Sequence, residues 1–186
     1  MEIRKFRSET PTTPIKVGNP TEGVVTPTKL NDETISILTE RLKDEYTAHY
    51  YYRAAANWCK NVNYKKAASY FESEASSELE HAKGLQDYMT DFNVMPQIPQ
   101  ATTEHDFENL VDIINGAYLM EKELMDSYNT NSSQLFTSDL TTFDFLKEYR
   151  EIQKSAVVEY SDLLNALLLV DYNDKFQLLY FEQTYF

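Results

Sequence analysis

A glutamate and a histidine three positions apart, Glu78 and His81, are the residues of this chain best suited to chemistry. On a helix, three steps of ~100° return most of a turn, so both side chains point to the same side. A second carboxylate, Glu45, lies 33 positions before Glu78, and a turn around Val62 separates the two segments. In an antiparallel helical pair the two glutamates are therefore level, roughly 24 Å from the turn at ~1.5 Å per residue.

The same arithmetic repeats in the second half of the chain. Glu121 and Gln153 are 32 positions apart with a midpoint at residue 137, and we interpret the polar run 129–133 close to this midpoint as the loop between two helices. Oxygen ligands at the same depth on two helical pairs describe a metal site inside a four-helix bundle. Carboxylates with one imidazole suit iron or manganese better than structural zinc, which prefers Cys and His.

Each of these polar groups interrupts an apolar stripe, where a carboxylate is costly unless it is paired or bound to metal. We expect Glu78 to bridge two metal ions, with Glu45 and His81 completing one site and Glu121 the other. Gln153 is neutral and is expected to hold water or to support a ligand. An isolated Glu-x-x-His pair is more often a solvated helix face, so the prediction depends on the shared depth of all five groups.

Four stretches with apolar residues at helical spacing must position these groups. The first opens at Asn31, a good helix cap, and runs to the turn around Val62. The others span about 64–91, 106–128 and 139–170. The connection over 92–105 is long enough, at ~3.3 Å per residue, to run the length of a helix, so it predicts a crossover that makes the second and third helices parallel.

The chain divides into three parts on composition. Residues 1–29 are rich in Thr and Pro, are mildly basic through Arg4, Lys5 and Arg7, and predict an extended tail. Residues 30–170 form the predicted bundle, and 171–186 form a short aromatic segment expected to pack on another subunit or on the end of the bundle. The tail is opposite in charge to the body, so it is suited to docking on an acidic surface or a separate protein partner.

Composition excludes several classes of protein. The net charge of −13 argues against a nucleic-acid partner and fits a protein that attracts cations, although excess acid also simply keeps helical proteins soluble. No apolar run approaches the ~18 residues of a membrane span, and no secretory pattern opens the chain. A single cysteine, Cys59, suits a reducing compartment, so we expect a cytoplasmic protein.

Several motifs together resemble the ferroxidase-centre motifs of H-type non-haem ferritins. They are the run 45–52, the later Trp58, the run 77–82, the segment 120–122 and the run 153–156, in the family's order and spacing. The resemblance covers roughly residues 30–170. It implies an all-α, ferritin-like four-helix bundle with a long crossover and a short C-terminal fifth helix. It also implies a di-iron centre that oxidises Fe(II) with dioxygen or peroxide, and a hollow homo-oligomeric shell of 24 subunits.

The resemblance also assigns a role to Tyr52, which falls on the family's tyrosine beside the di-iron site; plain core packing is the alternative. With Gln153 it is a candidate catalytic residue, and the predicted metal ligands are Glu45, Glu78, His81, Glu121 and Gln153. His49 is unusual at its position, and is either a hydrogen-bonded core histidine or an extra ligand near Glu45.

Departures from the family pattern keep other functions open. The fourth helix carries Gln153 and Ala156 where bacterioferritins and ribonucleotide-reductase-like proteins carry a second Glu-x-x-His. Beside the predicted site, Glu80 is flanked by Ser77 and Lys83, which thins the acidic surface expected to nucleate mineral. The sequence therefore predicts a cytoplasmic ferroxidase with iron storage. The alternatives are a structural or cargo protein docked to a larger assembly by its N-terminal tail, and a di-iron oxidase that acts on an organic substrate.

Overall fold

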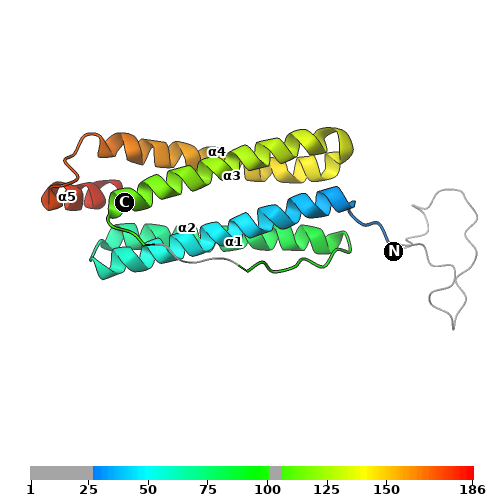
Figure 1. Ribbon diagram of the computed structural model, residues 1–186, viewed down its shortest axis with the longest axis horizontal. Coiled ribbons are helices and arrows are strands. Elements are labelled where there is room, and N and C mark those ends of the chain that lie inside the picture. The colour runs from blue at the N-terminus through cyan, green and yellow to red at the C-terminus, as the bar shows by residue number, and fades with distance from the viewer. Residues whose placement is uncertain (1–26, 101–105) are drawn as a thin grey trace, which may run out of the picture.

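The computed structural model describes residues 27–100 and 106–186, and these two ranges contain five helices and no strand (Figure 1). The helices are α1 (Asp32–Asn61), α2 (Lys65–Asp91), α3 (Leu110–Ser138), α4 (Leu140–Leu167) and the short α5 (Lys175–Tyr185). Helices α1 and α2 form one antiparallel hairpin, and α3 and α4 form a second that lies along it. This is the predicted four-helix bundle with a short fifth helix.

Local sequence explains where the first hairpin begins and turns. The Asn31 side chain accepts a hydrogen bond from the Thr34 backbone N–H at 2.8 Å, so it caps α1 as predicted. The turn to α2 contains Asn63, whose φ of 69° lies in the left-handed region that asparagine tolerates better than most residues. The predicted turn around Val62 is therefore confirmed, and Glu45 and Glu78 lie on facing helices.

The connection between α2 and α3 is the predicted crossover. It starts where α2 ends, at one end of the bundle, and α3 starts at the opposite end, so the two helices run in the same direction (Figure 1). Residues 92–100 and 106–109 of this connection are described. Asn109 then caps α3 by accepting a hydrogen bond from the Asp112 backbone N–H at 3.0 Å, so the helix starts a few residues later than predicted.

The predicted loop over 129–133 is wrong, because α3 continues through it to Ser138. Two of its polar side chains are hydrogen-bonded within the helical structure: the Thr130 hydroxyl donates to the Asp126 carbonyl at 2.8 Å, and Arg150 Nη1 donates to Ser132 Oγ at 2.5 Å. The hairpin turns at Asp139, whose side chain caps α4 by accepting from the Thr142 N–H at 3.0 Å. Tertiary packing therefore overrides the weak helix propensity of this run.

The core lies between the two hairpins and is unusually rich in aromatic rings. Tyr52, Phe71, Tyr128 and Tyr160 are all fully buried, each from a different helix. Because each tyrosine brings a hydroxyl into an apolar interior, each needs a hydrogen-bond partner or another reason to be there.

Helix α5 packs on the end of the bundle where α2 begins. Glu182 is fully buried, and its Oε1 accepts hydrogen bonds from the first amides of α2, Lys66 N at 2.7 Å and Ala67 N at 3.1 Å. A carboxylate at a helix N-terminus is favourable because it satisfies free amides and opposes the helix dipole. The aromatic segment therefore docks on the end of the bundle, one of the two locations predicted for it.

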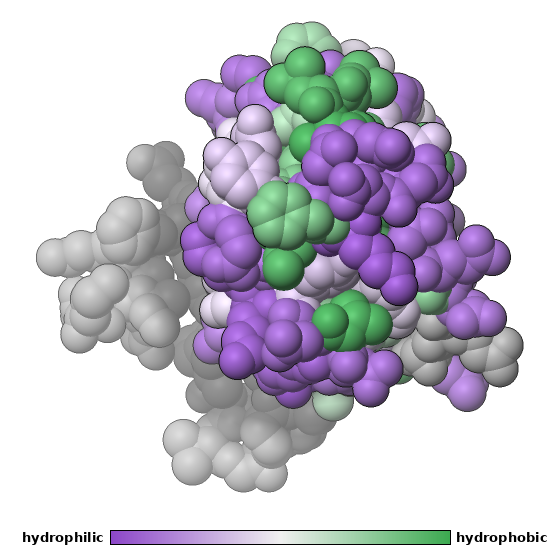
Figure 2. Space-filling model, turned by 90° about the vertical axis from the view of Figure 1, so that its left-hand side faces the viewer, coloured by the Kyte–Doolittle hydropathy of each residue, from purple (hydrophilic) through white to green (hydrophobic). Residues whose placement is uncertain are grey.

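This end of the molecule still exposes apolar side chains. Leu168, Leu169 and Phe176 are each at least three-quarters exposed, with relative exposures of 83%, 80% and 76%. Figure 2 views this end and shows separate apolar patches among polar ones.

Among the described residues, no helix is long and apolar enough to cross a membrane. Residues 1–26, most of the predicted tail, lie outside the described residues, so their docking stays a prediction.

Candidate metal centre

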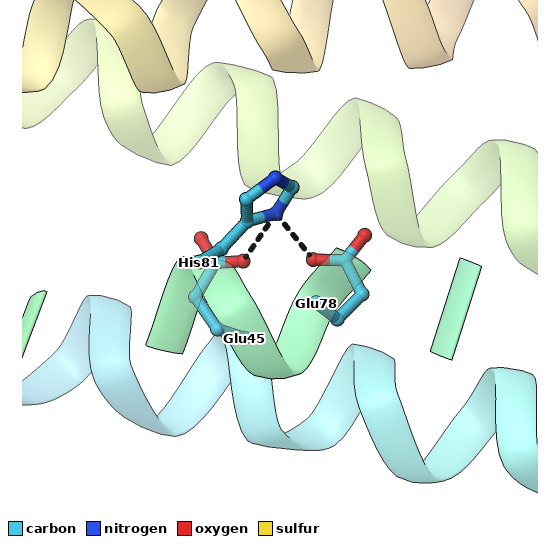
Figure 3. A group of neighbouring side chains, drawn as sticks. All are labelled: Glu45, Glu78 and His81. Atoms are coloured by element: carbon cyan, nitrogen blue, oxygen red, sulfur yellow. Dashed lines mark hydrogen bonds and ion pairs between the residues drawn. The ribbon is translucent and has the colours of Figure 1, made fainter. Parts of the chain in front are cut away.

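Glu45 from α1 and Glu78 and His81 from α2 meet in the interior, as the spacing predicted (Figure 3). One ligand atom from each can be chosen so that all three lie within 4.8 Å of one another. His81 Nδ1 lies 3.0 Å from Glu78 Oε2 and 3.5 Å from Glu45 Oε2. The imidazole thus lies between two carboxylates, one from each helix of the hairpin.

On the second hairpin, Glu121 of α3 and Gln153 of α4 are also buried, 1% exposed each, and neither belongs to this group of three. The charge of Glu121 nevertheless contributes to the raised pKa of Glu78. Three buried oxygens of the predicted site residues have no hydrogen bond among residues 27–100 and 106–186: Glu45 Oε2, Glu121 Oε2 and Gln153 Oε1. Since buried oxygens are rarely left unpaired, these are the groups that a cation would satisfy.

Protonation keeps this cluster stable when no cation is present. Burial raises the pKa of Glu78 well above its ordinary value, with the neighbouring carboxylates adding to the effect, and burial raises the pKa of Glu121 to about 7. Burial alone would lower the pKa of His81, but its contacts with Glu45 and Glu78 outweigh this and raise it to about 10. The centre therefore holds protons that a bound cation must displace.

Two tyrosines hold the glutamates from across the bundle. The Tyr52 hydroxyl on α1 donates to Glu121 Oε1 on α3, and the Tyr128 hydroxyl on α3 donates to Glu45 Oε1 on α1. Each tyrosine lies seven positions after the glutamate of its own helix. Tyr52 was a predicted site residue, whereas Tyr128 was not, although the repeated Glu-x6-Tyr spacing was available in the sequence as a signal.

His49 takes one of its two predicted roles. One ring nitrogen, Nδ1, lies 2.5 Å from the Ala75 backbone carbonyl, so this half-buried histidine is hydrogen-bonded between α1 and α2. The group of facing ligand atoms comprises Glu45, Glu78 and His81 within the described chain, without His49.

An open groove leads to the centre from the surface. It has a volume of about 450 Å³ and is lined by Glu78 and His81 together with the more exposed carboxylates Glu74, Glu148, Glu151 and Glu159. Burial, and then the nearby charge of Glu159, raise the pKa of Glu74 to about 7. The groove therefore gives a positive ion an acidic route to Glu78 and His81.

The arrangement of helices and ligands defines a class of protein, the four-helix bundle with a carboxylate-rich centre. A family model described as a ferritin-like domain matches residues 35–170, and the chain belongs to this ferritin family.

Relatives and solved structures agree with this assignment. The chain is 25% identical over 143 residues to a bacterial non-heme ferritin of Campylobacter jejuni, covering 76% of this chain and 86% of that protein. A bacterial non-heme ferritin of Staphylococcus saprophyticus is 26% identical over 145 residues, with 74% and 86% covered. The fold matches an open-pore ferritin of Archaeoglobus fulgidus with a TM-score of 0.74 and 17% identity, over 84% of this chain and 96% of that one.

Proposed function

We propose that this protein is a ferroxidase that oxidises Fe(II) at a pair of adjacent sites and supports iron storage or detoxification. The observation that carries the proposal is the grouping of Glu45, Glu78 and His81 within 4.8 Å, together with buried oxygens on Glu45, Glu121 and Gln153 that lack a hydrogen bond within the described chain. Membership of the ferritin family supports iron as the metal, and the ligand types suit Fe(II).

Each residue has a defined part in this proposal. Glu78 interacts electrostatically with Glu45 of the first hairpin and Glu121 of the second. It is therefore suited to bridge both ions, with Glu45 and His81 on one ion and Glu121 on the other. Gln153 offers a neutral oxygen for water or a weakly held ion. Fe(II) is the substrate, dioxygen or peroxide the oxidant, and the chain contributes geometry, open positions and proton acceptors.

The protons held at the centre determine how many protons are released when Fe(II) binds. At pH 7 His81 carries a proton, because its pKa is about 10, and Glu78 shares it through the 3.0 Å contact. An entering Fe(II) must displace this proton, which can leave through the carboxylates that line the groove. Binding of Fe(II) is therefore expected to release protons and to weaken as the pH falls.

Exchange of one buried carboxylate tests the proposal. Glu78→Ala should abolish coupled oxidation of two Fe(II) ions, since the bridging ligand serves both. The matched control is Glu80→Ala, a glutamate on the same helix whose side chain is 75% exposed. Titration calorimetry without oxygen counts the bound Fe(II), and absorbance follows the formation of Fe(III). Unchanged two-ion binding in Glu78→Ala would refute the site.

We also propose that copies of this chain assemble into a homo-oligomeric shell, for which 24 subunits is the family expectation. The exposed apolar side chains at the α5 end, Leu168, Leu169 and Phe176, support a protein contact there (Figure 2). Light scattering with metal analysis of the same sample measures the assembly. A monomer at micromolar concentration would contradict the shell and would favour a scaffold or cargo role.

A cytoplasmic location stays a prediction.

A further inference from the structure

A buried arginine lies beside the metal centre, on α1 one helical turn before Glu45. The side chain of Arg41 is only 7% exposed. Four residues of helix separate it from Glu45, about 6 Å along the helix axis. Its guanidinium carbon lies over the Tyr128 ring, 5.6 Å from the ring centre, and the Tyr128 hydroxyl donates to Glu45. Arg41 is therefore next to the residue that holds one of the predicted ligands.

The positive charge of Arg41 is only partly compensated. Its Nη2 lies 2.8 Å from Asp44 Oδ2, whereas Nε and Nη1 are buried without a hydrogen-bond partner in the described part of the chain. The Asp44 side chain is 36% exposed, so water screens its charge more than it screens the guanidinium. Arginine stays protonated in proteins. Arg41 is therefore a permanent positive charge inside the bundle.

The position of this charge gives the centre two different sides. Arg41 lines a hollow of about 410 Å³ between α1 and α3, whereas the groove that leads to Glu78 and His81 is lined by α2 and α4. The carboxylates around the hollow are all exposed and are therefore screened by water: Glu40, Glu123 and Asp126. An ion at the centre has a fixed positive charge behind it and an acidic groove in front of it.

A buried charge with incomplete pairing is costly, so the presence of Arg41 calls for a functional reason. We propose that Arg41 determines how long the centre keeps its oxidised product, because it repels Fe(III) more strongly than Fe(II) and favours release into the groove. This inference rests on the proposed ferroxidase function. It makes Arg41 a positioning residue for the product and not a ligand.

The size of the effect follows from the charges of the ions. Repulsion from a fixed charge is proportional to the charge of the ion, so a trivalent ion is weakened more than a divalent one. A unit charge ~10 Å away, at an effective dielectric constant of ~20, weakens binding roughly 15-fold for each charge on the ion. Partial compensation by Asp44 reduces this value, so we expect a difference of about 5- to 10-fold between the two oxidation states.

The proposed step is a ligand exchange in which no electron moves. Water replaces the carboxylate and imidazole ligands around Fe(III), and the emptied ligands take up protons or a new Fe(II) ion. Without the charge of Arg41, Fe(III) would stay longer and delay the next pair of Fe(II) ions. Arg41 should therefore affect repeated turnover and leave the first oxidation unchanged.

Redox-inert ions of the two charges test this role on the assembled, full-length protein. Zn²⁺ replaces Fe(II) and Ga³⁺ replaces Fe(III), and both affinities are measured by competition with nitrilotriacetate. Arg41→Met removes the charge and keeps a long side chain, and Arg41→Lys keeps the charge. Lys122→Gln is the matched control, because Lys122 directly follows Glu121 but its side chain is 48% exposed and pairs with Asp126 at 2.9 Å.

In Arg41→Met both ions should bind more tightly, and the gain for Ga³⁺ should exceed the gain for Zn²⁺ by about 5- to 10-fold. Arg41→Lys and Lys122→Gln should keep the natural ratio of the two affinities. Asp44→Asn should shift the ratio in the opposite direction, because it leaves the charge of Arg41 uncompensated. An unchanged ratio in Arg41→Met, an equal change in Lys122→Gln, or a ratio in Arg41→Lys that matches Arg41→Met would overturn the proposal.

Repeated loading with Fe(II) provides a second readout. Stopped-flow absorbance follows the oxidation of a first pair of Fe(II) ions per subunit, and then of a second pair added after the first reaction ends. In Arg41→Met the first oxidation should keep its rate at saturating Fe(II), whereas the second should slow by about 5- to 10-fold. Equal slowing of both rounds would indicate general damage to the centre and would contradict a role in release.

Two outcomes separate this proposal from the ferroxidase function. If the natural protein does not bind Zn²⁺, or if Glu78→Ala does not weaken its binding, the metal centre itself is wrong. If Zn²⁺ binding depends on Glu78 but the ratio of affinities does not depend on Arg41, only the role of Arg41 fails. Should Arg41→Met fold poorly, Asp44→Asn decides, because Asp44 is the more exposed member of the pair and its expected effect has the opposite sign.

Discussion

Each helical hairpin contributes two helices to the candidate metal centre. Helices α1 and α3 present the same two residue types there and form a matched pair, whereas α2 and α4 present different ones and form an unmatched pair. Helices α1 and α3 each carry a glutamate followed seven positions later by a tyrosine, and each tyrosine binds the other helix's glutamate. Helices α2 and α4 differ, because α2 presents Glu78 and His81 where α4 presents Gln153 and Ala156. The matched helices hold the carboxylates of Glu45 and Glu121 in place, and the unmatched ones would make the two proposed iron positions chemically unequal.

The largest effect is expected when the unmatched pair is made equal. Gln153→Glu with Ala156→His gives α4 its own Glu-x-x-His. Without metal, a further buried carboxylate should destabilise the fold by about 3 kcal/mol, since its charge is uncompensated. With metal, the second ion should bind more tightly and restore stability by mass action. Thermal unfolding with and without redox-inert Zn²⁺ measures both effects. Ala156→His alone is the control, and a double variant as stable as the natural apoprotein would contradict the prediction.

The matched pair predicts two equal losses. Tyr52→Phe and Tyr128→Phe each leave one buried glutamate oxygen without its donor, so each should lower the free energy of unfolding by about 1–3 kcal/mol. Urea unfolding of the apoproteins measures this. Because Tyr160 lacks a partner in the described chain, Tyr160→Phe is the reference for losing a buried phenol alone. A loss at Tyr128 no larger than at Tyr160 would show that its hydrogen bond to Glu45 does not hold the ligand.

The unmatched helices also meet outside the centre, where Glu74 of α2 lies near Glu159 of α4. Burial, followed by the charge of Glu159, raises the pKa of Glu74 from 4.5 to about 7. The folded state therefore binds this proton more tightly, and its contribution to stability falls as the pH rises from about 4.5 to 7. Glu74→Gln removes the titration. Relative to the natural protein, the variant should gain about 1 kcal/mol of stability between roughly pH 5 and pH 8, a value reduced for partial exposure.

Urea unfolding of the apoprotein at both pH values tests this difference. Glu80→Gln is the control, since its side chain is 75% exposed and should leave the pH dependence unchanged. A Glu74→Gln variant that follows the natural protein at both pH values would place the proton elsewhere.

The smallest effect concerns the outer surface of α2. Lys83, which lies 4.0 Å from Glu80, dilutes the acidic surface beside the groove. Lys83→Glu should increase the iron retained per assembly, because an added carboxylate offers hydrated Fe(III) another oxygen ligand. Metal analysis after loading and gel filtration measures retention, with Lys83→Gln separating loss of the positive charge from gain of a ligand. Retention near the capacity of known storage shells in the natural protein would contradict this account.

The sequence predicted the first hairpin better than the second, for a physical reason. The turn around Val62 coincides with a left-handed Asn63 and a break in the apolar stripes. Residues close to the turn therefore determine its position. The polar run 129–133 resembles a loop by composition, but its residues are held in α3 by long-range contacts such as Arg150 to Ser132. No local pattern reveals that contact, and the true turn at Asp139 is a single residue.

Helical spacing predicted that Glu45, Glu78 and His81 come together, and the structure groups these three side chains. For Glu121 and Gln153 the predicted loop at 129–133 is part of α3, so the structure agrees with the prediction only in burying both side chains. The tyrosine partners of the glutamates are harder to predict, since a tyrosine on an apolar stripe is usually interpreted as a core residue. Only the equal spacing of Tyr52 and Tyr128 from their glutamates distinguishes them, and nothing in the sequence shows that the Tyr160 hydroxyl is left without a partner in the described structure.

Because α5 docks near Cys59, the reactivity of this single thiol can be used to follow the undocking of the C-terminal helix. Cys59 is fully buried, and its pKa is raised to about 12, first by burial and then by the charge of Glu182, the residue that joins α5 to α2. Burial and the nearby Glu182 carboxylate both disfavour the thiolate that a thiol reagent needs, and undocking of α5 would remove the second of these effects. The rate at which Cys59 is labelled should report how often the helix lifts away. Comparing that rate before and after assembly would show whether neighbouring copies clamp α5 or release it.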